Sequence, residues 1–569
     1  MSPGAPPNAP TEPLLAPLIR SYAGSLLADA RVPSGGRGSG GGTAHTDRLL
    51  DIAAIPGVRP LVISALASGD DDDRGPIVVV TATTREADDL AAALAAFLPA
   101  TAVAVFPSWE TLPHERLSPR SDTVGRRLAV LRRLTHPDRN DPAYGPLSVV
   151  IMPVRALLQP LVTGLGDLAP VSLRAGDTAP LEDVVVALAD AAYTRTDLVE
   201  RRGEFAVRGG ILDVFPPTDE HPVRIEFFGD EVEEVRWFKV ADQRSLEIAE
   251  HGLWAPPCRE LLLTPAVRQR AADLAQQLPG VADMLTRISQ GMAVEGMESL
   301  APALVESMET VLDVLPADSV VVVLDPERVR TRAHDLVSTS AEFLEASWAN
   351  AAAGNQVPID LAGLLGTASY WTIGQARGHA ITHGIPWWGL TSFASDAELG
   401  EFLEEDGEGR RVDLHVTEPA LTRGDLDGAI SQLAAWLAAG WRTVLVTEGQ
   451  GLAKRVAQIL REHDLPVRLI DTAGSWAGWT GETVAVTTGA LGRGFIDERH
   501  RFVLLTESDL TGSSSGPGST KDMRRMPSRR RNQVDPLQLR PGDHVVHEQH
   551  GVGRFVEMVQ RTVGGATRE

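Results

Sequence analysis

Residues 193–238 read YTRTDLVERRGEFAVRGGILDVFPPTDEHPVRIEFFGDEVEEVRWF, and this stretch decides how the middle of the chain folds. Apolar and polar residues alternate from Phe205 to Arg208 and again from Val223 to Phe228, which is the period of β-strands. Gly209 and Gly229 stand where hairpin turns require a positive φ. The stretch therefore predicts a small antiparallel sheet with one face exposed, and on that face we place Arg195, Arg208 and Arg224.

On both sides of this block, helical and strand patterns alternate along the chain. Before it, the pattern includes a strand at 77–80 and an amphipathic helix at 122–134, whose four arginines we expect to face outward. A similar alternation returns at about 410–512. Such alternation is typical of parallel sheets covered by helices.

The composition favours protein partners over nucleic acid. With 53 Lys+Arg against 76 Asp+Glu, the net charge of −23 opposes unassisted binding to DNA, because affinity for phosphates comes mainly from counterion release by basic residues. Nearly every positive charge is an arginine, which suits bidentate pairing with carboxylates. No apolar run approaches the ~20 residues of a membrane span, and the single Cys258 cannot form an internal disulfide. We therefore expect a cytoplasmic protein with no membrane contact.

The phosphate loop of a nucleotide-driven motor is missing. Such a loop needs a lysine in a Gly-Lys-Ser/Thr sequence at the start of a helix. None of the three lysines follows a glycine, and the stretch after Val58 that would hold the loop runs into four aspartates, Asp70 to Asp73, which would repel a triphosphate. We predict no catalytic residue, no metal and no cofactor in this segment.

Two acidic sequences imitate a helicase box, Asp219-Glu220-His221 and Asp497-Glu498-Arg499-His500. Magnesium chemistry needs carboxylates at the C-terminal end of a buried strand. The first sequence lies in a Pro-rich turn and the second precedes its strand, so we interpret both as structural. We interpret Glu507 and Asp509 as capping or turn residues.

Three histidines near the end of the chain, His544, His547 and His550, repeat at a spacing that would suggest a metal site on a helix. The neighbouring valines and glycines favour a strand and a turn instead, where successive side chains alternate between faces. No metal is predicted there.

An arginine-rich run precedes these histidines, next to a Gly/Ser-rich stretch. It is either a solvated tether or a contact to nucleic acid or polymerase. The candidate residues are Arg524, Arg525, Arg529, Arg530 and Arg531.

Four separated motifs, in the family's order, resemble the bacterial transcription-repair coupling factors. They are SWETLPHERLSP at 108–119, the block at 193–238, TESDL at 506–510 and GDHVVHEQHGVGRF at 542–555. The resemblance covers nearly the whole chain. It implies an α/β multidomain fold: a degenerate helicase-like parallel-sheet domain similar to UvrB with an inserted small β-rich domain, a second α/β domain, and the beginning of a CarD-like small β-barrel.

The resemblance and the composition together divide the chain into seven segments. We predict a disordered or flexible N-terminal segment (1–45), the first part of the UvrB-like α/β domain (46–155), a β-rich UvrA-binding domain (156–245), the second part of the UvrB-like domain (246–375), a third α/β domain (376–512), a Gly/Ser- and Arg-rich linker (513–540) and the start of an RNA polymerase-interacting domain (541–569). The chain stops partway through this last barrel, which we expect to fold poorly without its other strands.

The function that the resemblance implies is that of an adaptor. The N-terminal part of a coupling factor recruits the repair protein UvrA to RNA polymerase stalled at DNA damage, and a C-terminal domain masks the UvrA surface in the intact protein. ATP, magnesium and DNA belong to the C-terminal motor of the intact family, an ATP-dependent DNA translocase that displaces the polymerase. We expect this segment itself to be catalytically silent.

Two alternatives remain open. The first is a UvrB-type damage-verifying helicase, which the missing phosphate loop disfavours, as does the absence of a long aromatic hairpin between Val150 and Leu157. The second is a CarD-like transcription regulator in which the N-terminal domains serve as a scaffold.

The resemblance also assigns contact residues. It implies that Arg195 and Arg208 contact UvrA. Ala206 occupies a position where UvrB has an arginine, so one of the UvrB contacts is absent here. Phe215 is expected in the core. The module that binds the polymerase β subunit contains His547, His550, Gly551, Gly553, Arg554 and Phe555.

Overall fold

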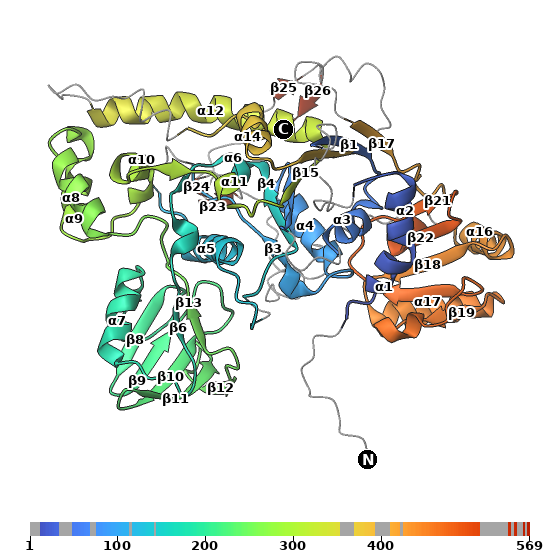
Figure 1. Ribbon diagram of the computed structural model, residues 1–569, viewed down its shortest axis with the longest axis horizontal. Helices are drawn as coiled ribbons and strands as arrows, with labels where there is room; N and C mark the ends of the chain where they lie inside the picture. The colour runs from blue at the N-terminus through green and yellow to red at the C-terminus, as the bar shows by residue number, and fades with distance from the viewer. Residues whose placement is uncertain are drawn as a thin grey trace. The chain divides into compact units, whose positions relative to one another are not determined.

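The computed structural model (Figure 1) describes residues 12–33, 48–68, 75–112, 117–141, 144–352, 369–392, 410–421 and 425–511, together with four short strands between 544 and 568. The chain divides into two units, residues 1–514 and 515–569. Within the described residues, no helix combines the length and the apolar character that crossing a membrane requires.

Seven parallel strands form the main sheet, in the order β17-β1-β16-β15-β2-β4-β3. Several are continuous runs of buried β-branched residues, as expected for strands covered on both faces. Their bounds are β1 Leu49–Ala53, β2 Ile77–Thr81, β3 Val103–Val105, β4 Val149–Pro153, β15 Val320–Leu324, β16 Trp387–Thr391 and β17 Arg410–Asp413.

Helices cover both faces of this sheet. Val79 packs with Leu61 and Leu90 in one core, while Val78 packs with Leu128 in a second core on the opposite face. The first face carries α3 (Arg59–Ala67) and α4 (Thr84–Leu94). The second carries α5 (Ser121–Thr135), α6 (Val154–Leu158), α11 (Val311–Val314), α14 (Ile373–Thr382) and the start of α12 (Pro326–Ala352).

The position of β16 and β17 corrects one predicted boundary. We assigned residues from 376 onwards to the third α/β domain, but Trp387 pairs with both Leu49 and Val321, and Arg410 pairs with Leu50. Both strands therefore belong to the main sheet. Parallel strands are joined by long crossovers, so neighbours in the sheet need not be neighbours in the sequence.

A six-stranded sheet is inserted between β4 and β15, in the order β12-β11-β10-β9-β8-β7. Adjacent strands are antiparallel except for β7 and β8. The bounds are β7 Thr194–Arg195, β8 Glu204–Arg208, β9 Ile211–Val214, β10 Val223–Phe228, β11 Glu231–Phe238 and β12 Ser245–Ile248. With α7 (Leu181–Asp190) on one face, it forms what we call the β domain, and the predicted antiparallel sheet is confirmed.

Two further antiparallel pairs lie beside the β domain and the helical segment that follows it. β6 (Val171–Leu173) pairs with β13 (Leu253–Ala255), and β5 (Leu161–Val162) pairs with β14 (Met308–Glu309). The helical segment has its own small core. Its helices are α8 Pro265–Leu274, α9 Ala282–Ser289 and α10 Ala301–Leu304.

A buried ion pair joins α5 to this helical segment. Nε of Arg127 lies 2.5 Å from Oε1 of Glu260, which also accepts a hydrogen bond from the indole of Trp109 at 3.0 Å. Arg127 is fully buried, and its guanidinium stacks over Phe106. The prediction that all four arginines of this helix face outward is therefore wrong for Arg127, because periodicity alone does not reveal a buried partner 133 residues away.

The region predicted as the third α/β domain contains a five-stranded sheet, and we call it the second α/β domain of the structure. The strand order is β19-β20-β18-β22-β21, and neighbouring strands are parallel except for β21 and β22. Its strands are β18 Arg442–Thr447, β19 Val467–Leu469, β20 Val484–Thr488, β21 Phe495–Asp497 and β22 Phe502–Thr506. Its helices are α16 Leu426–Ala438, α17 Gln450–Glu462 and α18 Glu507–Thr511.

An N-terminal helical segment packs against this second sheet. α1 (Ala16–Leu18), a π-helical turn (Ile19–Ala23) and α2 (Gly24–Asp29) follow one another, and Tyr22 is completely buried. The Tyr22 ring stacks on Phe502 with centroids 4.0 Å apart, and its hydroxyl donates to Asp497 at 2.6 Å. The prediction of a disordered or flexible segment is therefore wrong for residues 12–33, because their apolar side chains find partners more than 400 residues away.

Candidate functional site

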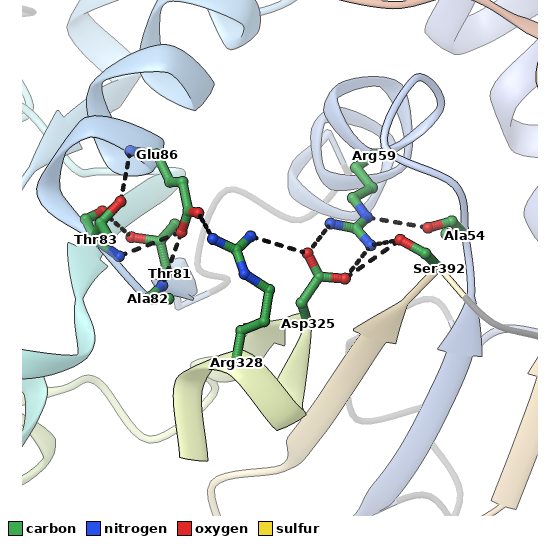
Figure 2. Close-up of polar contacts among 9 residues, drawn as sticks. All are labelled: Ala54, Arg59, Thr81, Ala82, Thr83, Glu86, Asp325, Arg328 and Ser392. Carbon is green, nitrogen blue, oxygen red and sulfur yellow. Dashed lines mark hydrogen bonds and ion pairs between the residues drawn. The ribbon is translucent and has the colours of Figure 1, made fainter. Parts of the chain in front are cut away.

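Ligands of open parallel sheets bind at the carboxyl ends of the strands, and in this chain a set of ion pairs fills that edge. Figure 2 shows Arg59, in the first turn of α3, facing Asp325, which follows β15. Nη1 and Nη2 of Arg59 donate to the carboxylate at 2.9 and 2.6 Å. Nε and Nη2 also donate to the Ala54 carbonyl and the Ser392 hydroxyl, at 3.0 and 2.8 Å.

The Arg59 side chain of this pair is buried and the Asp325 side chain is partly exposed. Arg59 is only 6% exposed. Burial alone would raise the pKa of Asp325, but the hydrogen bonds and the charge of Arg59 outweigh burial and lower that pKa below its ordinary value. The carboxylate is therefore ionised at neutral pH, and its stabilising contribution is lost only as the pH falls through the lowered pKa.

The N-terminus of α4, at the same edge, is capped by the chain itself. Thr83 and Glu86 form a capping box, and Oε2 of Glu86 accepts from the backbone amides of Ala82 and Thr83 at 3.1 and 3.2 Å. Arg328 donates to the other oxygen of Glu86 and lies 3.8 Å from Asp325 (Figure 2). Two of the amides at this N-terminus, those of Ala82 and Thr83, therefore already have a carboxylate partner.

The backbone between β1 and α3 is closely packed at Gly57. A Cβ added at Gly57, between β1 and α3, would lie 2.1 Å from the carbonyl oxygen of Gly494 in the second α/β domain. On the other side of the sheet, β4 ends at Pro153 and α6 begins at Val154, so no hairpin separates them. A DNA-clamping hairpin is therefore absent between β4 and α6.

The two acidic sequences that imitate a helicase box have structural contacts. Asp497 is buried and accepts from Tyr22 and from the backbone amide of His500 at 3.0 Å. Asp219 lies in the Pro-rich turn, where burial raises its pKa to about 7. Asp509 accepts from the amides of Gly494 and Thr506, as predicted for a turn residue.

In the β domain, Arg195 and Arg208 lie along the same edge of the sheet. Arg195 is on the outermost strand β7, paired with Phe205 of β8, and Arg208 is at the end of β8. Both are exposed, and Nη2 of Arg208 donates to the carbonyl of Asp197 at 2.8 Å. Within the described residues, no carboxylate pairs with either guanidinium. We call Arg195, Leu198 and Arg208 the arginine edge.

Leu198 was missed from the sequence. It is 40% exposed and adjoins Asp197, whose carbonyl holds Arg208. An exposed apolar side chain beside exposed arginines adds apolar contact area to a charged surface, and arginine is enriched in protein interfaces. The signal was readable as a leucine within a charged turn, TDLVERR, although only the structure shows that it is exposed.

The prediction that Arg224 is exposed on the sheet face is wrong. Its guanidinium makes a bidentate pair with the buried Asp213, at 2.7 and 2.8 Å, and lies over Phe238. The hydrogen bond with Asp213 raises the pKa of Arg224. The loop after β11 also covers this face, where Ala206, Phe215 and Phe238 form a second small core, so Phe215 is in the core as expected.

In the second unit, β23 (His544–His547) pairs antiparallel with β24 (Gly551–Arg554), and β25 (Arg561–Val563) pairs with β26 (Ala566–Arg568). His544 and His547 therefore belong to a strand, as predicted. The hairpin contains Gly551, Gly553 and Arg554 of the predicted polymerase module, whereas His550 and Phe555 lie outside the described residues. The arginines from Arg524 to Arg531 lie outside them as well.

Three protein-family models match the chain. They are the UvrB interaction domain at residues 171–256, the MFD D3 domain at 439–510 and the CarD-like/TRCF RID domain at 539–569. The first match contains the whole β domain, including the arginine edge, and the second lies within the second α/β domain.

Curated relatives match over most of the chain. A transcription-repair-coupling factor of Mycobacterium bovis is 48% identical over 91% of the chain and 41% of its own length. Those of Escherichia coli and Myxococcus xanthus are 28% and 27% identical, over 81% and 86% of the chain. The chain spans about two fifths of the length of these relatives.

Proposed function

Since the chain belongs to the transcription-repair-coupling factor family, we propose that it is the adaptor part of such a factor, which recruits UvrA to an RNA polymerase stalled at DNA damage. The observation that carries this proposal is the arginine edge, because it lies within the matched UvrB interaction domain and offers two guanidinium groups that have no carboxylate partner among the described residues. A UvrB-type helicase is not favoured, because ion pairs fill the edge of the main sheet where a nucleotide would bind.

The arginine edge provides both parts of a docking contact. Free guanidinium groups pair with carboxylates through two parallel hydrogen bonds, which gives geometric specificity. The exposed apolar surface of Leu198 lies close enough to Arg208 for both to contact one partner surface. Arg224 contributes no such contact because Asp213 already holds it.

We predict that Arg195→Glu and Arg208→Glu each weaken UvrA binding by about 10–100-fold, equivalent to roughly 1–3 kcal/mol for a charge-assisted contact. Titration of each purified variant with UvrA, by calorimetry or interferometry, measures the effect. Arg244→Glu is the matched control, because Arg244 is exposed in the β11–β12 loop beside the opposite edge strand. Unchanged affinity in both edge variants would place the interface elsewhere.

We propose RNA polymerase, through its β subunit, as the partner of residues 539–569, which match the CarD-like/TRCF RID domain. Separate pull-downs with UvrA and with RNA polymerase test the two partners independently. A CarD-like regulator with a scaffold N-terminus predicts capture of the polymerase alone. The cytoplasm is the compartment that this function requires.

We also propose that ATP, magnesium and DNA translocation belong to the motor of the intact factor and that this segment is silent. We expect no saturable ATP binding and no DNA-stimulated hydrolysis by the chain. Any trace hydrolysis in a preparation should be unchanged in Arg59→Met, because Arg59 already pairs with Asp325. Robust DNA-stimulated hydrolysis that disappears in Arg59→Met would contradict this assignment.

In the intact factor, we propose that a C-terminal domain covers the UvrA surface until polymerase and ATP are engaged. The segment alone should then bind UvrA more tightly than the intact factor does. Equal affinity of both for UvrA, without polymerase or ATP, would argue against masking.

A further inference from the structure

Three side chains that bind metals well meet on the face of the main sheet away from α3 and α4. His379 and His383 lie on and just after α14, and Asp313 lies on α11, which contacts α14 (Figure 1). One ligand atom from each of the three residues lies within 4.8 Å of the other two. Nε2 of His379 is 2.7 Å from Oδ1 of Asp313.

The histidine spacing favours a shared ligand. His379 and His383 are four residues apart, which places them on one face of a helix, one turn from each other. Their ring centroids are 4.0 Å apart. In a tetrahedral zinc site with bonds of 2.0–2.2 Å, ligand atoms are about 3.3 Å from one another. The three ligand atoms, which already lie within 4.8 Å of one another, need to move closer by about 1.5 Å at most to reach this distance.

Contacts with the surrounding protein hold each ligand in the required form. Nδ1 of His383 lies 2.9 Å from the backbone carbonyl of His379, and since a carbonyl only accepts, Nδ1 carries the proton and Nε2 keeps a free lone pair. Oδ2 of Asp313 accepts from the amide and the hydroxyl of Thr310, which leaves Oδ1 for a metal. Trp371 packs edge-on against the His379 ring, with the two ring centroids 5.1 Å apart.

We propose that Asp313, His379 and His383 form a binding site for a divalent transition metal, with zinc as the best match. Two imidazole nitrogens and one carboxylate oxygen suit zinc and its neighbours rather than magnesium, which prefers oxygen ligands. The metal replaces the hydrogen bond between His379 and Asp313, and solvent supplies the fourth ligand because the site is partly exposed. It links α11, which precedes β15, to α14, which precedes the neighbouring strand β16.

Zinc titration of the untagged chain tests the site. We expect one tightly bound zinc that Mg²⁺ does not displace, a rise in the melting temperature on zinc addition, and the visible absorption of a tetrahedral site when Co²⁺ replaces zinc. Loss of a residue that only orients a metal ligand typically weakens metal binding by about 10–100-fold. Because His383 is proposed as a ligand itself, His383→Gln should weaken zinc binding by more than this. Asp313→Asn should also weaken it.

Two controls separate this site from other histidines. His463→Gln should bind zinc like the wild type, because His463 bonds to the carbonyl four residues earlier, as His383 does, but belongs to no such cluster among the described residues. A His547→Gln, His550→Gln double variant should also keep the tight zinc. Wild-type zinc affinity in both His379→Gln and His383→Gln would overturn the proposal, as would loss of the tight zinc in the double variant alone.

Discussion

Replacing Glu260 by alanine is expected to lower the free energy of unfolding of the region around α5 by about 3–5 kcal/mol. Among the described residues, Glu260 is the one carboxylate paired with Arg127, and both side chains are buried. Without it, a guanidinium with no exposed surface has no carboxylate partner, and the Trp109 indole loses its acceptor. Hydrogen exchange of the α5 amides measures the loss locally, which is suitable because a chain of several domains need not unfold in one step.

A surface pair provides the comparison for this result. Glu327→Ala removes an exposed partner of Arg330 and should cost less than about 1 kcal/mol. Replacing both buried partners, as in Arg127→Met with Glu260→Leu, should recover most of the stability, since two apolar groups leave no uncompensated charge. A loss below about 1 kcal/mol in Glu260→Ala would show that water reaches Arg127 and that the pair is not buried in solution.

Tyr22→Ala is expected to cost about 3–5 kcal/mol, the range for deleting a large buried aromatic side chain. The ring stacks on Phe502 and Phe495, and the hydroxyl donates to the buried Asp497. Loss of the ring should release the N-terminal helical segment from the second α/β domain, so residues 12–33 should become sensitive to limited proteolysis.

The hydroxyl and the ring of Tyr22 can be separated by a second variant. Tyr22→Phe keeps the stacking but removes one donor to Asp497, which should cost roughly 1–3 kcal/mol. Arg20→Ala, in the same segment, alters only an exposed pair with Glu12 and should leave the proteolysis pattern unchanged. Equal protection of residues 12–33 in Tyr22→Ala and the wild type would contradict this account of how the segment is held.

The strands of the β domain were predictable from the sequence because they depend on local patterns. Alternation predicts β8 and β10, and the turn glycines predict the hairpin connections beside them. Asp509 accepts from the amide of Thr506, only three residues earlier, which is a local turn contact. The absent phosphate loop was readable in the same way, since a single missing lysine decides it.

Long-range partners were not predictable. Arg224 and Arg208 look alike in the sequence, yet only Arg224 finds a buried carboxylate on the neighbouring strand. The spacing of His379 and His383 was visible, but Asp313 comes beside them only when α11 packs against α14. Periodicity gives the face on which a residue lies but not the side chain that meets it there.

The pairing of β6 with β13 brings the two ends of the β domain together, so the domain is a single insertion that can be removed or exchanged as a whole. Val171 and Ala255 face each other in register, so the chain leaves for the β domain and returns from it at points about 5 Å apart. Excising the domain would leave two ends that a short turn can rejoin, with the seven-stranded order of the main sheet unchanged. Recombination at this one place would therefore exchange the whole β domain, without any change to the main sheet that carries it.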